Sequence, residues 1–437
     1  MSFQAVVGMR QEDKSPWERR APLSPAHVRQ LLERTDVEVV VEPSPTRAFA
    51  DAAYAEAGAR VTADLSSCRT ILGVKEIPPA KLAPGVTYLY FAHVIKGQPA
   101  NMPMLQTLLD RGCSLIDYEK VTDDEGRRLI FFGRHAGLAG MIDTLWAFGQ
   151  RWARRGVLTP LAAIRRAHEY ADIDDAKRHI RQLGARLARE GIPSALQPLT
   201  IGLTGYGNVS QGAQEVLDML PVGGITPADL AAGRFGSLPI DRSVIKVVFE
   251  EHHMFEPTDP GRVFDLQDYY DVPSRYRSRF DKLWPRLRVL VNCIYWDSPY
   301  PRLVTRRGLR ERAAAGTLRL DVIGDISCDI EGAIEVTARP TTVDDPVFTY
   351  DPASDSIHRG LAGAGPVVMA IDNLPCELPA DATRAFGDSL VDFIPALAEA
   401  HGPDGLDAER LPAGLRRALI AHRGELTADY RYLKRFL

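Results

Sequence analysis

The first 135 residues alternate between strand-like and helix-like stretches, and this alternation limits the possible folds more than any other feature. Short apolar runs that read as strands lie at residues 5–10, 37–42, 70–75, 87–93 and 114–119. Helical segments lie between several of them, at 24–34, 51–58 and 101–112. Alternation at this spacing is typical of a parallel, doubly wound α/β sheet.

Each of the five apolar runs ends on a charged or titratable side chain. These residues are Arg10, Glu42, Lys75, His93 and Glu119. The carboxyl ends of parallel strands share one edge, and open α/β sheets bind ligands along that edge. We therefore expect a functional site there, although polar residues would also stand at these positions if the strands simply ended in solvent.

A second α/β region begins with an apolar strand at 199–204, which runs into the loop GYGNVS and then an amphipathic helix. In a dinucleotide-binding loop the first glycine, here Gly205, permits a tight turn, and the second, Gly207, lets the backbone approach a pyrophosphate. Asn208 and Val209 follow, and Ser210 is small enough for close helix packing. The alternative is a glycine-rich turn without a ligand.

A chain of 437 residues is long enough for two domains. We predict two Rossmann-like domains with an active-site cleft between them. Residues 1–135 plus 375–437 would form the substrate (catalytic) domain, and 136–374 the dinucleotide-binding domain. The stretch 380–437 is expected to be mostly helical and to return to the first domain.

Composition narrows the function further. The net charge of -4 gives no reason to expect a nucleic-acid partner. Five scattered cysteines without CxxC spacing indicate neither a metal site nor a disulfide framework, and they suit the cytoplasm. No stretch is apolar enough to predict a membrane span.

A dinucleotide site implies hydride transfer, which also requires proton carriers and groups that hold the substrate. Lys75 and His93 are the candidate catalytic acid–base residues. The candidate substrate-binding residues are Arg19, Arg20 and Arg128, whose forked guanidinium groups suit carboxylates, and Glu119, which suits an ammonium group. The implied substrate is small, polar and anionic, with an amine or keto group.

The cofactor prediction rests on the second strand of the dinucleotide domain, which often ends in an acidic residue that bonds the ribose 2′-hydroxyl. We take this strand to lie in PVGGITPADL and to end near Thr226-Pro227, with Asp229 two residues late. The missing carboxylate favours NADPH over NADH. Arg234 or Arg242 would then contact the 2′-phosphate.

The segments WERRAPLSP, ILGVKE, FAHVIKGQ, DYEKVTDDEGRR and TGYGNVSQGAQ carry a family resemblance over nearly the whole chain. The chain resembles the lysine–ketoglutarate reductase domain, which is the N-terminal half of alpha-aminoadipic semialdehyde synthase. More distantly it resembles saccharopine dehydrogenase, alanine dehydrogenase and transhydrogenase. The resemblance implies that L-lysine, 2-oxoglutarate and NADPH give saccharopine.

The resemblance also implies roles for individual residues. It matches Lys75 and His93 to a catalytic pair; Arg20, Glu119 and Arg128 to the substrate site; and Gly205, Gly207 and Val209 to the cofactor loop. Asp325, Asp329 and Asn373, in DISCDIEG and AIDNLP, complete the residues that we assign to the cofactor site.

In saccharopine dehydrogenase a lysine precedes the E-x-R segment. This chain departs from that pattern, because Ser15 stands at the position of the lysine, next to Lys14. Three alternatives stay open: an NAD-dependent, lysine-forming saccharopine dehydrogenase, a related reductase for another amine such as ornithine, and a nucleotide-sensing regulator. A homo-oligomer and a separate saccharopine-oxidising enzyme are both compatible with the sequence.

Overall fold

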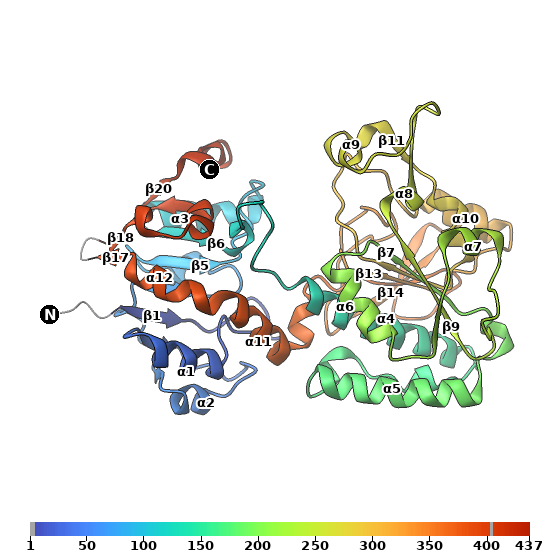
Figure 1. Ribbon diagram of the computed structural model, residues 1–437, viewed down its shortest axis with the longest axis horizontal. Coiled ribbons are helices and arrows are strands. Elements are labelled where there is room, and N and C mark those ends of the chain that lie inside the picture. Colours follow the sequence, from blue (N-terminus) through green and yellow to red (C-terminus); the bar gives the residue numbers. More distant parts are fainter. Residues whose placement is uncertain (1–4, 403–404) are drawn as a thin grey trace. The chain divides into compact units, whose positions relative to one another are not determined.

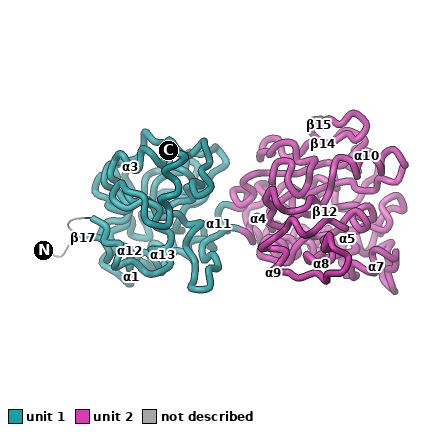
Figure 2. The backbone as a smooth tube through the Cα atoms, turned by 90° about the horizontal axis from the view of Figure 1, so that it is seen from above, with its two compact units in different colours: residues 1–132, 379–437 teal, residues 133–378 magenta. Residues whose placement is uncertain are grey.

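The computed structural model describes residues 5–402 and 405–437 and consists of two compact units (Figure 2). Unit 1 comprises Met1–Phe132 and Pro379–Leu437, and unit 2 comprises Gly133–Leu378. Each unit contains an eight-stranded, largely parallel sheet with helices. The predicted class, α/β with two Rossmann-like doubly wound units, is confirmed.

The sheet of unit 1 has the strand order β20-β19-β6-β5-β4-β1-β2-β3 (Figure 1). Its strands are β1 (Val6–Met9), β2 (Glu38–Val41), β3 (Arg60–Val61), β4 (Thr70–Leu72), β5 (Thr87–Tyr90), β6 (Ser114–Asp117), β19 (Leu419–His422) and β20 (Glu425–Leu426). The helices are α1 (Pro25–Arg34), α2 (Asp51–Glu56), α3 (Met102–Asp110), α11 (Pro379–Leu390), α12 (Ile394–Glu399) and α13 (Ala413–Arg417), and a two-stranded sheet is formed by β17 (His401–Gly402) and β18 (Gly405–Leu406).

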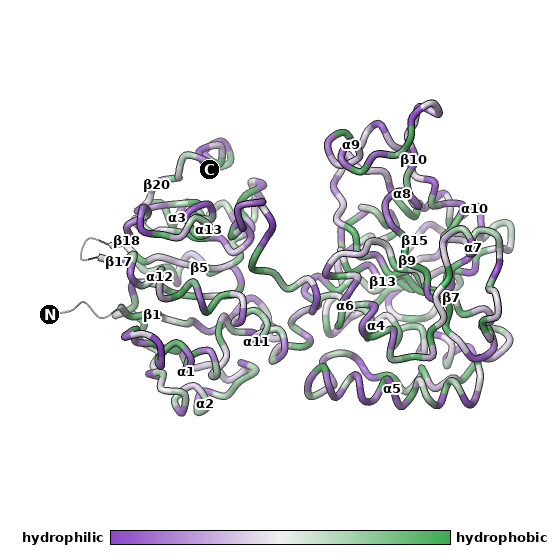
Figure 3. Tube along the Cα trace, in the orientation of Figure 1, coloured by the Kyte–Doolittle hydropathy of each residue, from purple (hydrophilic) through white to green (hydrophobic). Residues whose placement is uncertain are grey.

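The local sequence explains these elements. Ser24 caps α1 through its side chain, which accepts a hydrogen bond from the His27 backbone at 3.4 Å, and Pro25 takes the first helical position. Every residue of β4, β5 and β6 is buried, as expected for strands covered on both faces. The strands at the centre of both units include strongly hydrophobic stretches (Figure 3).

Unit 1 differs from the expectations in two places. The strands end earlier than predicted, so Lys75 and His93 each lie three residues beyond β4 and β5, on the loops that follow. The stretch 380–437 contains α11, α12 and α13, as expected for a mostly helical segment, but it also supplies β19, which pairs antiparallel with β6. This strand is too short, and too closely followed by charged residues, to give a periodic signal.

The sheet of unit 2 has the strand order β15-β14-β16-β13-β12-β7-β9-β8, in which only β14 and β15 run antiparallel to their neighbours. Its strands are β7 (Thr200–Thr204), β8 (Val222–Gly224), β9 (Val244–Phe249), β12 (Val289–Asn292), β13 (Val322–Asp325), β14 (Val347–Asp351), β15 (Ser356–Arg359) and β16 (Val367–Met369), and a separate hairpin pairs β10 (Phe255–Pro257) with β11 (Tyr276–Ser278). The helices are α4 (Gly133–Arg154), α5 (Ile173–Glu190), α6 (Asn208–Leu217), α7 (Pro227–Ala232), α8 (Glu251–Met254), α9 (Leu266–Asp271) and α10 (Arg306–Ala314).

The order of the strands in space differs from their order in the chain. β7 lies between β12 and β9, and it pairs with β9 in register from Thr200 opposite Ile245 to Thr204 opposite Phe249. The earlier strand β8 pairs only with the far side of β9. Among the described residues, no helix is long and apolar enough to cross a membrane.

Candidate active site

In unit 1 the loops after β4 and β5 lie side by side, because these strands are parallel neighbours. The register pairs Leu72 with Leu89, and continuing it places Glu76 opposite His93. His93 Nδ1 lies 2.7 Å from Glu76 Oε1. Lys75 and His93 thus follow neighbouring parallel strands of one sheet, as predicted, but they lie on the loops beyond the strand ends, and the structure adds Glu76 to them.

The orientation of His93 is fixed from two sides. Its backbone adopts φ 48°, a left-handed conformation that is costly for a residue with a Cβ, and its carbonyl accepts a hydrogen bond from Asn101 Nδ2 at 3.0 Å. Burial raises the pKa of Glu76, but the hydrogen bond and charge of His93 outweigh burial and lower this pKa to about 2. An ionised Glu76 accepts the Nδ1 proton, which leaves Nε2 of His93 for proton exchange.

A buried carboxyl group holds the loop that carries Lys75. Glu12, just after β1, accepts hydrogen bonds from the backbone N–H groups of Val74 at 2.8 Å and Lys75 at 3.0 Å. Its side chain is 2% exposed, and Arg10 Nη1 lies 3.9 Å away. Burial raises the pKa of Glu12 to about 7.

A second buried carboxyl group holds the loop that carries His93. Asp117, the last residue of β6, is 0% exposed and accepts hydrogen bonds from the N–H groups of Ala92 at 3.3 Å and Glu119 at 2.9 Å. Burial raises the pKa of Asp117 to about 7. Glu12 and Asp117 thus fasten the two loops from opposite sides.

The arginines expected to bind the substrate are placed differently from one another. Arg20 is buried and donates two hydrogen bonds to Glu18, from Nε at 2.7 Å and Nη2 at 2.6 Å. Arg19 Nε donates to the Thr46 carbonyl at 3.0 Å. The Arg128 side chain is 42% exposed, and its Nη1 lies 3.9 Å from Glu119 Oε1, so two of the expected substrate residues lie close together here.

An aromatic cluster links Arg20 and Arg128 to the rest of the edge. The Arg20 guanidinium lies 4.3 Å from the ring centre of Phe132, and that of Arg128 lies 5.8 Å from the ring centre of Phe91. Phe91 and Phe132 are 5.9 Å apart. Lys14, next to the departure at Ser15, reaches Glu76 Oε2 at 3.3 Å and so adds a cation beside His93.

In unit 2 the loop GYGNVS has the geometry of a dinucleotide turn. Gly205 has φ +77°, and a Cβ there would lie 2.9 Å from Ile294 Cγ2. A Cβ on Gly207 would meet nothing within 4 Å, so the backbone is open where a pyrophosphate would approach the N-terminus of α6. Asn208 is exposed and Val209 half-buried in the first turn of that helix.

Close helix packing holds this turn in place. Ser210 is fully buried, and Cβ atoms on Gly137 of α4 or Gly212 of α6 would overlap backbone carbonyl oxygens of the opposite helix. Small residues therefore let α4 and α6 approach backbone to backbone, which is the packing expected of the third position of the loop.

A cavity of about 270 Å³ adjoins the glycine loop. Its lining includes Gly205, Tyr206, Gly207 and Glu251, and a group of aromatic side chains closes it. Glu251 Oε1 accepts a hydrogen bond from Tyr270 Oη at 3.0 Å, and the charge of Glu251 raises the pKa of Tyr206. The cavity therefore combines an open loop, aromatic walls and one carboxylate.

The remaining residues assigned to the cofactor site separate into two groups. Asp325 is 1% exposed, accepts hydrogen bonds from Asn292 at 2.9 Å and Thr337 at 2.5 Å, and has its pKa raised by burial to about 6. The Asp325 side chain is therefore hydrogen-bonded to other residues of unit 2. Asp329 and Asn373 are half-buried on the loops that follow the parallel strands β13 and β16, at the same sheet edge as the glycine loop.

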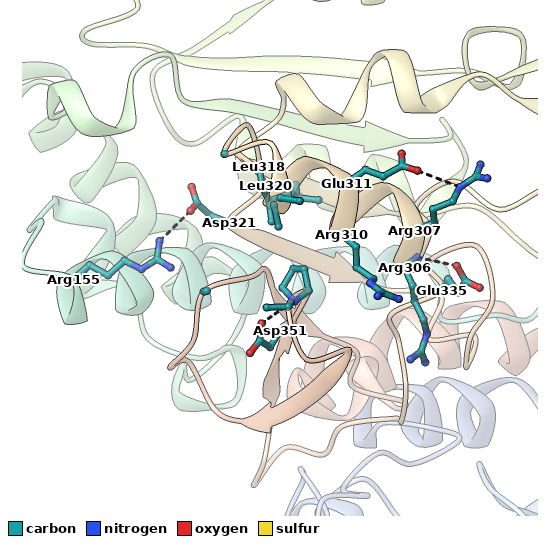
Figure 4. A pocket seen from close by; sticks show the side chains of 16 residues that line it. Arg155, Arg306, Arg307, Arg310, Glu311, Leu318, Leu320, Asp321, Glu335 and Asp351 are labelled. Atoms are coloured by element: carbon teal, nitrogen blue, oxygen red, sulfur yellow. Dashed lines mark hydrogen bonds and ion pairs between the residues drawn. The ribbon is translucent and has the colours of Figure 1, made fainter.

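A cavity of about 1040 Å³ in unit 2 lies elsewhere (Figure 4). It is lined by Leu320 and Asp321, which precede β13, and by Asp351, which ends the antiparallel β14. It therefore lies at the opposite sheet edge from the glycine loop. Its arginines lie close to carboxylates, as in Arg155 with Asp321 at 3.5 Å, so we do not assign the nucleotide to it.

Comparisons with known proteins show what the chain is related to. Residues 8–139 match the family described as alanine dehydrogenase/PNT, N-terminal domain. The alpha-aminoadipic semialdehyde synthase of Arabidopsis thaliana is 37% identical over 98% of this chain and 41% of its own length. The alpha-aminoadipic semialdehyde synthases and the saccharopine dehydrogenases are therefore homologues of this chain.

Two further relatives define the extent of the match. The saccharopine dehydrogenase [NAD(+), L-lysine-forming] of Yarrowia lipolytica is 28% identical over 90% of this chain and 92% of its own length. An L-alanine dehydrogenase structure aligns with a TM-score of 0.62 and 18% identity over 99% of this chain and 98% of its own, which shows the shared fold. The chain spans less than half the length of the semialdehyde synthases that it matches.

The structure also corrects the reason given for NADPH. One strand beside β7 is β9, and Glu250 follows it directly, whereas the segment ending near Thr226-Pro227 belongs to the outer strand β8. Sequence reasoning also missed Glu12, Glu76 and Asp117. Glu76 stands next to Lys75, and Asp117 is the carboxylate inside SLIDYE, so both were visible as charges in apolar runs.

Proposed function

We propose that this chain is a pyridine-nucleotide-dependent oxidoreductase that joins L-lysine and 2-oxoglutarate to form saccharopine. The observation that carries the proposal is the contact between His93 and Glu76. Glu76 follows Lys75 on the loop after β4, and His93 lies on the neighbouring loop after β5. Arg128 and Glu119 lie at the same sheet edge. The family supports an oxidoreductase of lysine and saccharopine metabolism. Unit 1 would supply the acid–base and substrate groups, and unit 2 the nucleotide loop.

The reaction needs two proton movements and one reduction. The neutral ε-amine of lysine attacks the keto carbon of 2-oxoglutarate, the hydroxyl leaves as water, and the resulting imine is reduced at that carbon. The bound nicotinamide supplies the hydride. One proton must leave the amine and one must reach the departing hydroxyl, so two proton carriers on adjacent loops suit the chemistry.

The chain's own residues have distinct tasks in this proposal. His93, oriented by Glu76, exchanges a proton at Nε2, and Lys75 is the second carrier. Arg128 holds a substrate carboxylate, and Glu119 receives the ammonium group of lysine. Arg20, paired with Glu18, stabilises the aromatic wall beside Arg128 and keeps that wall in place.

The loop of unit 2 fits a dinucleotide because Gly207 is open and stands at the start of a ten-residue helix. Gly205, Gly207 and the backbone N–H groups of Asn208 and Val209 would receive the pyrophosphate. Asp329 and Asn373 would face the nicotinamide end, since their loops leave the same sheet edge. Five cysteines without a disulfide among the described residues suit the proposed cytoplasmic setting.

The lysine-forming direction is the second candidate. It is favoured because the match to the saccharopine dehydrogenase of Yarrowia lipolytica covers 90% of this chain and 92% of that protein. The same residues would serve either direction, since a catalyst lowers the barrier both ways.

The testing experiment is a reductant-oxidation assay with the purified chain, 2-oxoglutarate and a panel of amines including lysine and ornithine, repeated in reverse with saccharopine. We expect turnover with lysine and 2-oxoglutarate to exceed that with any other amine. Turnover with ornithine but not lysine would favour a related reductase. Nucleotide binding without turnover of any amine would favour a regulator.

A further inference from the structure

We propose that the nucleotide site selects NADH and NAD⁺ over their phosphorylated forms, through the carboxylates of Glu250 and Glu251. This inference rests on the proposed nucleotide site of unit 2. It reverses the preference expected from the sequence, because it follows the order of the strands in space instead of their order in the chain.

The position of the two carboxylates follows from the pairing of β7 with β9. The glycine-loop strand β7 has two neighbours, and β9 is the one that follows the glycine loop first in the chain. In dinucleotide-binding sheets an acidic residue that follows the glycine loop in the chain contacts the ribose 2′-hydroxyl. Here Thr204 pairs with Phe249, and the Gly205 N–H donates to the Phe249 carbonyl at 2.8 Å. One and two residues further on, Glu250 and Glu251 stand level with Gly205 and Tyr206.

The two side chains differ in their surroundings. Glu250 is exposed at the start of α8, where its backbone N–H donates a hydrogen bond to His253 Nδ1 at 3.0 Å. Glu251 is half-buried in the cavity that Gly205 and Gly207 also line, and Tyr270 Oη holds its Oε1 at 3.0 Å. One carboxylate thus stays open to a ligand, and the other is oriented at the wall of the site.

The chemistry of a carboxylate discriminates between the two cofactors. A carboxylate oxygen accepts a hydrogen bond from a ribose 2′-hydroxyl, but it repels a 2′-phosphate, which carries a charge of about -2 near neutral pH. Two adjacent carboxylates strengthen this repulsion. A site for NADPH would instead place arginine or lysine at this strand end.

Among the described residues, His252 is a cation-forming group beside these two carboxylates; its Nδ1 lies 3.6 Å from Glu250 Oε2 on an exposed surface, and it carries a charge only when protonated. The described residues that line the 270 Å³ cavity include no arginine or lysine. Arg234 lies 3.0 Å from Asp229 and lines a different cavity beside β8. Lys246 lies 2.6 Å from Asp218, and burial lowers the pKa of His253, which favours its neutral form.

The test is calorimetric binding of NADH and NADPH to the full chain without substrates. We expect NADH to bind at least about ten-fold more tightly, a difference that one or two contacts can supply. The double substitution Glu250→Arg with Glu251→Ser should reverse the order. Asp229→Asn, which removes the carboxylate after β8, is the matched control and should leave the ratio unchanged.

Each outcome bears on the inference. Equal binding, or tighter binding of NADPH by the unaltered chain, overturns it and leaves the proposed reaction standing. Binding of neither nucleotide overturns both the inference and the nucleotide part of the proposed function. A changed ratio in Asp229→Asn, with none in the double variant, would assign the selection to β8 and contradict the inference. The unaltered chain gives a decisive ratio even if a variant fails to fold.

Discussion

Replacing Glu12 with glutamine tests how the loop that bears Lys75 is held. The buried carboxyl group accepts two backbone N–H groups, from Val74 and Lys75. Glutamine keeps one acceptor oxygen but turns an amide N–H₂ group toward the other donor. One buried N–H then lacks a partner, which costs about 1–3 kcal/mol of folding free energy.

The size of the pH effect follows from the burial of Glu12. Its pKa is raised from 4.5 to about 7 in the fold. At about 1.4 kcal/mol per pH unit, this difference corresponds to about 3 kcal/mol of stability that is present below pH 4.5 and lost as the pH rises through about 7. The glutamine variant stays neutral and lacks this dependence. The variant should be less stable than the parent in acid and should equal or exceed its stability in mild alkali.

The measurement is urea unfolding at several pH values, followed by hydrogen exchange and mass spectrometry. Peptides from residues 5–132 report the stability of unit 1 separately from that of unit 2. Glu42→Gln is the matched control, because Glu42 follows β2 at the same edge and accepts a single N–H, from Gln11 at 2.9 Å. A constant difference between Glu12→Gln and the parent from about pH 5 to about pH 8 would refute the reasoning, since Glu12 would then be ionised in the fold throughout.

Three further predictions concern activity. Lys75→Met and His93→Gln should each lower kcat by about 10²-fold with unchanged nucleotide affinity. The double variant should lose less activity than the product of the two single losses, since the effects of coupled groups are not additive. Wild-type rates would mean that both side chains only face solvent. Glu76→Ala should lower kcat with unchanged nucleotide affinity, because His93 Nδ1 loses the carboxylate that lies 2.7 Å away and orients the ring, and an unchanged kcat would contradict this. Gly207→Val should abolish nucleotide binding in calorimetry while the circular dichroism spectrum is retained, and near-normal binding would show that the loop is only a turn.

The features that the sequence predicted well are local ones. The alternation of strands and helices and the loop around Gly205 each depend on residues close together in the chain. The strands that precede Lys75 and His93 were correctly expected to be neighbours, because consecutive parallel strands commonly pair.

The features that the sequence did not predict depend on distant pairing. The insertion of β9 between β7 and β8 cannot be read from chain order, and it decides which carboxylates stand beside the glycine loop. The pairing of β19 with β6 joins segments about 300 residues apart in a strand too short to be periodic. The buried roles of Glu12 and Asp117 were missed because charged residues near strand ends are expected to face solvent.

The most direct test of the proposed reaction follows the hydride itself. The purified chain is supplied with L-lysine, 2-oxoglutarate and reduced nicotinamide nucleotide that carries deuterium at the transferred position, and the product is analysed by mass spectrometry and NMR. The proposal predicts saccharopine with one deuterium on the carbon that was the keto carbon of 2-oxoglutarate. Deuterium in any other product, or saccharopine without deuterium at that carbon, would contradict it.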